Sequence, residues 1–247
     1  MTHAVVPLDL VLFFLATLIG AVVAGVAGFA FGLIASAIWL HIISPAQSAP
    51  LIAAFAILIQ GATLWKLRHA IQWSRLVPFI VGGALGIPIG AATLSWASPT
   101  QMSVFIGAAL IVFSLYSLAR PNLPAVKGGP LADGVVGVLS GAFSGSAGLA
   151  GVPVIVWASL RRWSKDEQRA VFQPMAVVLL LIAGITLAAS GSITRPIVEL
   201  LMIGLPGLLL GTWAGFELYG RLNDEAFRKA VLALLLASGV FLLATFR

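Results

Sequence analysis

Long apolar runs separated by short polar connections make up most of this sequence. Prolines, capping residues and loops divide it into ten apolar segments, each predicted to be a helix. The segments cover residues 9–24, 29–43, 46–65, 74–95, 100–119, 131–145, 149–160, 166–188, 196–216 and 225–246. Six are long enough to cross a hydrocarbon core of ~30 Å at about 1.5 Å per residue. The pattern predicts an all-α polytopic membrane protein.

The first two segments meet at a glycine cluster that returns in the second half of the chain. The first cluster, GAVVAGVAGFAFG, spans residues 20–32, and the second, GAFSGSAGLAG, spans residues 141–151. A shift of 120 residues places Gly25 on Gly145 and Gly28 on Gly148. Glycine is costly inside a helix, so matched clusters indicate a helix break or a close approach of two backbones.

The same shift relates two predicted helix starts. Ser44 is followed by Gln47, and Ser164 is followed by Glu167. Each pair is a serine with a glutamine or glutamate three residues later, which is the signature of a capping box. The local signals for helix formation therefore repeat together with the glycines.

The match continues into the fourth segment of each half. At a shift of 121 it pairs two glycines of each half, Gly86 with Gly207 and Gly90 with Gly211. We therefore expect a first transmembrane repeat over residues 1–120, a linker over 121–130 and a second repeat over 131–247, each with five segments.

The segments next to the glycine clusters have only about 12 to 16 residues, so each pair is predicted to form a short hairpin that returns to its own side of the membrane. With hairpins, twelve of the fourteen basic residues lie on one face, as the positive-inside rule requires. A single broken span would instead place the basic loop from Arg161 to Arg169 outside. Eight to ten membrane segments then form two inverted repeats, and both termini face the periplasm.

Tryptophans at segment ends suit the headgroup region of a bilayer. Six are placed there: Trp39, Trp65, Trp73, Trp96, Trp157 and Trp163.

Composition narrows the function. Hydrophobic residues are 60% of the chain and charged residues 9%, so the lipid bilayer is a partner and a soluble fold is excluded. The net charge of +6 reflects orientation in the membrane, and no nucleic-acid partner is expected. The sequence has no cysteine and three histidines without ligand spacing, which predicts no metal and no cofactor. It also lacks the residues of an enzyme active site.

Inverted repeats with broken helices are typical of transporters, whose sites lie where half-helices end near the middle of the membrane. The two glycine turns would face each other there, and their backbone N–H groups suit an anion. Buried amides and hydroxyls could add ligands, although helix packing explains the glycines and glutamines as well. The candidate binding residues are Gly25, Gly28, Phe29, Ser144, Gly145, Ser146, Gly148, Leu149, Gln173 and Gln60.

The middle of each segment lacks acidic and basic residues, so no proton relay is evident. Glu199 comes closest, but it lies one turn from Arg195, where an ion pair is expected. The anion is therefore expected to move alone or in exchange.

The two glycine motifs, in a chain of this length, resemble the TauE/SafE family of sulfite exporter-like permeases. The resemblance implies an inner-membrane permease that exports sulfite, an organosulfonate or a related sulfur anion. Leu149 and Pro153 replace the run of glycines commoner in the family after the second turn, which leaves the substrate open. An anion channel and a non-transporting membrane scaffold are the alternatives. A homo-oligomer is compatible with the sequence.

Overall fold

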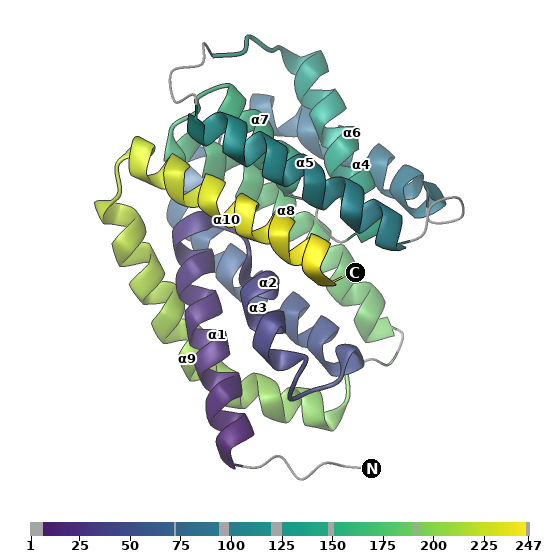
Figure 1. Cartoon of the computed structure of the whole chain (residues 1–247), viewed down its shortest axis with the longest axis vertical. Helices are drawn as coiled ribbons and strands as arrows, with labels where there is room; N and C mark the ends of the chain where they lie inside the picture. The colour runs from purple at the N-terminus through teal and green to yellow at the C-terminus, as the bar shows by residue number, and fades with distance from the viewer. Residues whose placement is uncertain are drawn as a thin grey trace. The chain divides into compact units, whose positions relative to one another are not determined.

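The computed structural model describes residues 7–71, 73–93, 99–119, 125–147, 151–189, 191 and 193–245. Within these residues every regular element is a helix, as predicted, and each expected segment corresponds to one α-helix (Figure 1). The helices are α1 (Pro7–Ala27), α2 (Phe31–Trp39), α3 (Pro45–Leu67), α4 (Trp73–Thr93), α5 (Pro99–Ala119), α6 (Pro130–Ala147), α7 (Val152–Leu160), α8 (Lys165–Ala189), α9 (Arg195–Arg221) and α10 (Asp224–Thr245), with a 3-10 turn at Arg68–Ala70.

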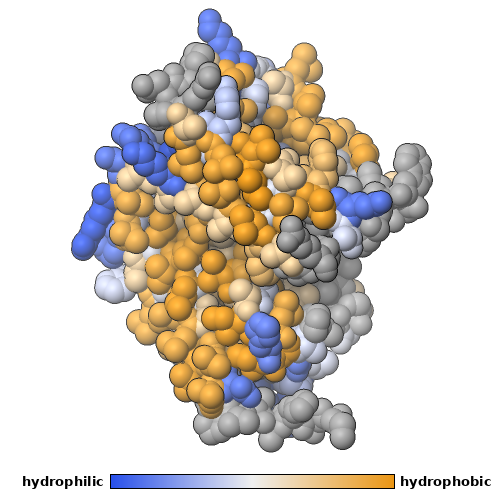
Figure 2. All heavy atoms as spheres, viewed as in Figure 1, coloured by the Kyte–Doolittle hydropathy of each residue, from blue (hydrophilic) through white to orange (hydrophobic). Residues whose placement is uncertain are grey.

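Four of these helices are long and apolar enough to cross a membrane by themselves: Leu8–Ala27, Gln47–Lys66, Trp73–Gly90 and Arg195–Arg221. Figure 2 shows hydrophobic side chains over most of the visible helix surfaces, with hydrophilic ones gathered near helix ends such as the end of α9. Large apolar residues such as Leu131 and Phe105 are 89% and 68% exposed. Such a surface fits lipid, and the chain is a multi-pass membrane protein.

Each glycine cluster joins two helices that fold back on each other, as predicted, but the first helix of each pair is longer than expected: α1 has 21 residues and α6 has 18. The return of each hairpin to its own side of the membrane stays a prediction. Helices α2 and α7 have nine residues each and are about 14 Å long, too short to span a bilayer. At the end of α2, Trp39 Nε1 donates to the carbonyl of Phe13 on α1 at 3.4 Å. In α7, Trp157 Nε1 donates to Asp133 Oδ1 on α6 at 2.8 Å. Phe13 and Asp133 are 120 positions apart, so a tryptophan ties each short helix back to the same place in its repeat.

Both capping boxes are also present. Ser44 N donates to Gln47 Oε1 at 3.2 Å, and Gln47 N donates back to Ser44 Oγ at 3.4 Å. Ser164 N donates to Glu167 Oε2 at 3.1 Å, and Glu167 N donates back to Ser164 Oγ at 3.2 Å. These bonds satisfy N–H groups that a helix start otherwise leaves without a partner, and they fix where α3 and α8 begin.

The chain forms two compact units, and each contains parts of both halves of the sequence. Unit 1 comprises Met1–Lys66 and Val177–Leu222, and unit 2 comprises Leu67–Ala176 and Asn223–Arg247. In unit 1, α9 packs along α1, and in unit 2, α4 packs along α6 and α5 along α10 (Figure 1). The units follow contacts between helices, whereas the predicted repeats follow similarity of sequence. The division into repeats at residues 120 and 131 stays a prediction.

In unit 2, α4 crosses α6 with the two backbones in direct contact. A Cβ atom at Gly86 would overlap the carbonyl of Val138, and one at Gly90 would overlap the carbonyl of Ala142. Both glycines lie on one face of α4, one turn apart. Only glycine permits this approach, so these residues are required for packing of the helix pair.

Unit 1 contains the corresponding crossing of α9 over α1. A Cβ atom at Gly211 would overlap the carbonyl of Leu18, and one at Gly215 would lie 2.5 Å from the carbonyl oxygen of Val22. In both crossings the residue numbers rise together along the two helices, so α9 runs parallel to α1 and α4 runs parallel to α6.

These contacts correct the sequence pairing of the glycines. The partners on α1 and α6 are 120 positions apart, but the glycines that touch them are 125 apart. Gly86 therefore corresponds to Gly211, and Gly90 corresponds to Gly215. The pairing of Gly86 with Gly207 is therefore wrong by one helical turn. Residues four positions apart lie on the same helix face, so the sequence alone does not distinguish Gly207 from Gly211 as the partner of Gly86.

The basic loops of unit 2 lie together at one end of the unit, as the predicted topology requires. Three contacts join the starts of α4, α6, α8 and α10 with the end of α7. They are Arg75 Nη1 to Glu167 Oε1 at 2.9 Å, Arg161 Nη1 to Asp133 Oδ1 at 2.9 Å, and Lys165 N to Asp224 Oδ1 at 3.0 Å. Their placement on the cytoplasmic side stays a prediction.

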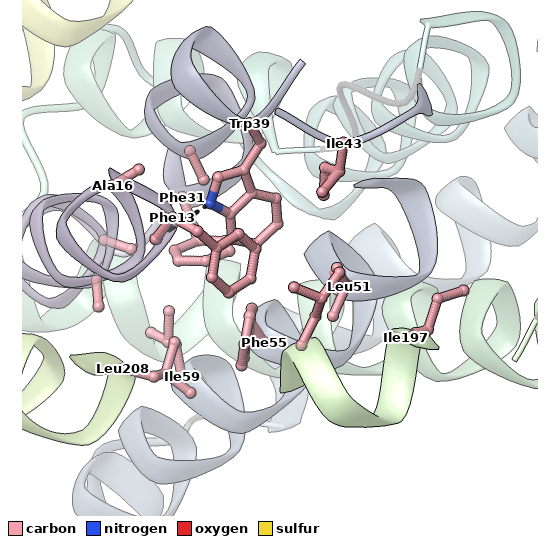
Figure 3. Close-up of a cluster of buried hydrophobic side chains, with 14 residues drawn as sticks. Phe13, Ala16, Phe31, Trp39, Ile43, Leu51, Phe55, Ile59, Ile197 and Leu208 are labelled. Carbon is pink, nitrogen blue, oxygen red and sulfur yellow. Dashed lines mark hydrogen bonds between the residues drawn. The ribbon is translucent and has the colours of Figure 1, made fainter. Parts of the chain in front are cut away.

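Trp39 does not lie at a lipid interface as predicted. Its ring is fully buried in unit 1, stacked on Phe13 at 4.7 Å and in edge contact with Phe31 at 5.8 Å (Figure 3). The return of α2 along α1 carries the ring inward, which position in the sequence alone does not reveal. Trp65 and Trp73 are 72% and 66% exposed near helix ends, as expected, and Trp96 lies outside the described residues.

Candidate functional site

The first glycine turn breaks the helix between α1 and α2. Gly28 has φ 86° and Ala30 has φ 73°, both in the left-handed region. Glycine adopts this conformation readily, whereas alanine does so at a cost of about 1–2 kcal/mol. Two left-handed residues within three positions stop α1 and direct the chain into α2. The break lies inside an apolar hairpin, with Gly28 buried.

The start of α2 has no side-chain cap. Its N-cap residue is Ala30, whose methyl group cannot accept a hydrogen bond, and α2 begins at Phe31. The N–H groups of a first helical turn have no partner within the helix, and the helix dipole adds partial positive charge there. The turn therefore presents hydrogen-bond donors and a positive potential to an anion.

Gln60 reaches this turn from α3. Its side-chain Nε2 donates to the carbonyl oxygen of Gly28 at 2.8 Å, and the residue is 6% exposed. The sequence named Gln60 and Gly28 as candidate ligands, and the structure brings them together. Gln60 Oε1 is buried, and no donor among the described residues reaches it.

Gly25 lies one turn before the break, at the crossing with α9. A Cβ atom there would lie 2.9 Å from the Cα of Gly215 and 3.1 Å from the carbonyl oxygen of Thr212. This contact gives Gly25 a role in packing, the alternative raised for the glycine motif. Phe29 lies within the break and is half-buried. Direct binding by Gly25 and Phe29 stays a prediction.

The second glycine turn is described only at its edges. Gly148 and Leu149, two of the candidate residues, lie outside the described residues. Ser144 lies in the last turn of α6 and is half-buried, and Gly145 and Ser146 follow it in the same helix. On the far side, α7 begins after Gly151, again without a side-chain cap.

Helix α8 lies against this second turn. A Cβ atom at Gly151 would overlap the ring of Phe172. Gln173, the remaining candidate from the sequence, is next to Phe172 and is 0% exposed. Gln173 therefore lies on the helix that packs against the second turn.

Arg169 is the residue that the sequence reasoning missed. The sequence predicts a basic cytoplasmic loop at this position, but Arg169 lies in the second turn of α8 and is only 1% exposed. It precedes Gln173 by four residues and Phe172 by three, so the three side chains share one helix face. In the sequence, the i,i+4 spacing of Arg169 and Gln173 is the signal that could have placed both on one helix face. The continuous helix from Lys165 carries Arg169 inward, which corrects the loop assignment.

A buried guanidinium has a defined chemistry. It stays charged, its burial requires interactions with negative or polar groups, and its planar donors match the oxygens of a carboxylate, phosphate or sulfur oxyanion. Unit 2 therefore places a cation on the helix face that packs against its glycine turn.

Comparison with known proteins tests the resemblance noted in the sequence. The family model described as "Sulfite exporter TauE/SafE" matches residues 12–242, which is nearly the whole chain. No curated protein and no solved structure gives a match. The family match includes both glycine turns and confirms the resemblance. The chain therefore belongs to the TauE/SafE family of sulfite exporters, a family of membrane transporters.

Proposed function

We propose that this protein is a permease that exports a small sulfur anion, such as sulfite or an organosulfonate, across the inner membrane, with both termini in the periplasm. Family membership supports transport of sulfur compounds. The observation that carries the proposal is the broken first hairpin, where the buried amide of Gln60 bonds the carbonyl of Gly28 just before the uncapped start of α2. A scaffold would not need a left-handed break inside an apolar hairpin.

Arg169 supports an anion as the transported species. A buried guanidinium near the second turn attracts oxyanions and excludes cations. Sulfite and sulfonates each carry oxygens that two parallel N–H groups of a guanidinium can bind. We infer that Arg169 and the N–H groups at the start of α7 bind the anion, and that Gln173 positions it on the α8 face.

Export of an anion can use the membrane potential alone. An inside-negative potential drives a monoanion outward by about 2.3 kcal/mol for each 100 mV. This energy equals roughly a fortyfold concentration gradient. Glu199 lies 2.9 Å from Arg195 in an exposed pair, which fits a structural role rather than proton transfer. We infer uniport or anion exchange.

Sulfite efflux from proteoliposomes tests this function. Efflux should saturate with sulfite concentration and accelerate when a potassium diffusion potential makes the interior negative. Arg169→Gln should lower efflux at least tenfold, whereas Arg195→Gln, which alters an exposed arginine, should leave it unchanged. Arg169→Lys, which retains the charge, should recover part of the rate.

Efflux that follows an imposed pH gradient and ignores the potential would contradict uniport. Flux that rises linearly without saturation would indicate a channel. Absence of flux in the folded wild-type protein, with every sulfur anion tried, would reject transport.

A further inference from the structure

The side-chain amide of Gln60 has a fixed orientation. Its Nε2 lies 2.8 Å from the carbonyl oxygen of Gly28, so this end of the amide must be the donor. Rotating the amide by 180° would place two oxygens against each other. Oε1 is therefore the end that remains available, close to the first glycine turn.

Oε1 is an acceptor in a place with few donors. Gln60 is 6% exposed, and no donor in the described part of the chain reaches Oε1. Gln60 lies within the apolar span Gln47–Lys66, where lipid offers no hydrogen bonds. A buried acceptor without a donor is unfavourable, and a ligand that supplies one removes the penalty.

The turn thus offers two complementary features to a ligand. The uncapped start of α2 provides donors and partial positive charge, which suit anionic oxygens. Gln60 Oε1 requires a donor. An anion without any O–H or N–H group would accept hydrogen bonds from the start of α2, but it would place one of its own lone pairs against Gln60 Oε1.

We propose that the first glycine turn selects sulfur anions that carry one negative charge and one hydrogen-bond donor, with Gln60 Oε1 accepting the donor. This inference rests on the proposed anion transport and specifies its substrate. The donor has two chemical sources. One is the hydroxyl of hydrogensulfite itself, and the other is a hydroxyl on the organic part of a sulfonate.

Two matched pairs of anions separate these sources. In the first pair, methanesulfinate replaces the hydroxyl of hydrogensulfite by a methyl group. In the second, propane-1-sulfonate replaces the hydroxyl of 2-hydroxyethanesulfonate by a methyl group. Binding to the purified full-length protein in nanodiscs is measured by isothermal titration calorimetry at a mildly acidic pH. We expect the hydroxyl-bearing member of at least one pair to bind about 5- to 20-fold more tightly.

A substitution assigns the preference to Gln60. In Gln60→Met the ratio within the preferred pair should fall to about one, because methionine fills the space without an amide. Thr63→Val is the matched control. Thr63 lies on the same helix, is 1% exposed and donates to the carbonyl of Ile59 at 2.8 Å, so its hydroxyl is already satisfied. This variant should retain the wild-type ratio.

Equal affinity within both pairs in the wild type overturns the proposal, and this test needs no variant to fold. A preference that survives in Gln60→Met also overturns it. If none of the four anions binds, anion transport fails as well, whereas equal binding of all four rejects only the role of Gln60.

Discussion

Asp133 should be one of the most sensitive positions for stability. Its Oδ1 accepts hydrogen bonds from Trp157 Nε1 at 2.8 Å and from Arg161 Nη1 at 2.9 Å. The side chains of Asp133 and Arg161 are only 7% and 17% exposed. This ion pair anchors the end of α7 to the start of α6 and holds the second hairpin closed.

The loss of stability in Asp133→Ala comes from the charge of Arg161, which stays buried without its carboxylate partner. Removing one partner of a buried ion pair costs about 3–5 kcal/mol, since the other charge stays buried. Arg161 keeps a hydrogen bond to the carbonyl of Gly128 at 3.2 Å and a contact with the Trp163 ring at 5.1 Å. We therefore expect the lower end of that range, about 3 kcal/mol.

The measurement is thermal unfolding in detergent, followed by tryptophan fluorescence. At about 2–4 °C per kcal/mol for a chain of this size, the midpoint should fall by roughly 6–12 °C. Asp133→Asn should lose less, because its amide oxygen can still accept one bond. The control is Glu199→Ala, which breaks an exposed pair with Arg195 and should cost less than about 0.5 kcal/mol.

A double-mutant cycle with Arg161→Met isolates the pair itself. The double variant Asp133→Ala/Arg161→Met should be more stable than additivity predicts, because no charge is left buried alone. Equal losses for Asp133→Ala and Glu199→Ala, or strict additivity in the cycle, would refute the reasoning.

Other changes give contrasting outcomes. In Gly90→Leu the leucine side chain would overlap the α6 backbone, so folded protein should be absent in fluorescence-detected size-exclusion chromatography. In Gly61→Ala the added Cβ atom would have nothing within 4 Å, so this change should stabilise α3 by about 0.5–1 kcal/mol. Ser164→Ala should lower thermal stability by about 1 kcal/mol through loss of the capping box. A single cysteine at the exposed residue Asp166 should react with an impermeant maleimide only from the cytoplasm, and one at the exposed residue Thr194 only from outside. Labelling of both positions from one side would contradict the topology.

The helices and their starts could be predicted from the sequence because their causes are local. Capping boxes at Ser44 and Ser164 depend on residues three positions apart, and both formed as expected. The hairpins could also be predicted from segment length and charge, although α1 and α6 are longer than the expected segments. The candidate pair Gln60 and Gly28 could be named, but only the fold shows that the amide bonds this carbonyl.

Other features depend on distant parts of the chain and were therefore missed. Burial of Trp39 requires α2 to return along α1. The position of Arg169 depends on α8 continuing inward from a basic loop. The register between Gly86 and Gly211 is ambiguous in sequence, because glycines one turn apart occupy the same helix face. Tertiary packing decides each of these cases.

The construction of each unit from both halves of the sequence has a consequence for biosynthesis. Helix α1 packs along α9, so the face of α1 that meets the α9 glycines has no α9 partner while residues 28–194 are still being made. At 5–20 residues per second this delay is roughly 10 to 30 s, far longer than a helix needs to form. During that time the early helices must wait within the membrane beside lipid or the insertion machinery. Unit 1 cannot close until α9 leaves the ribosome, which makes its assembly a late, largely post-insertional step.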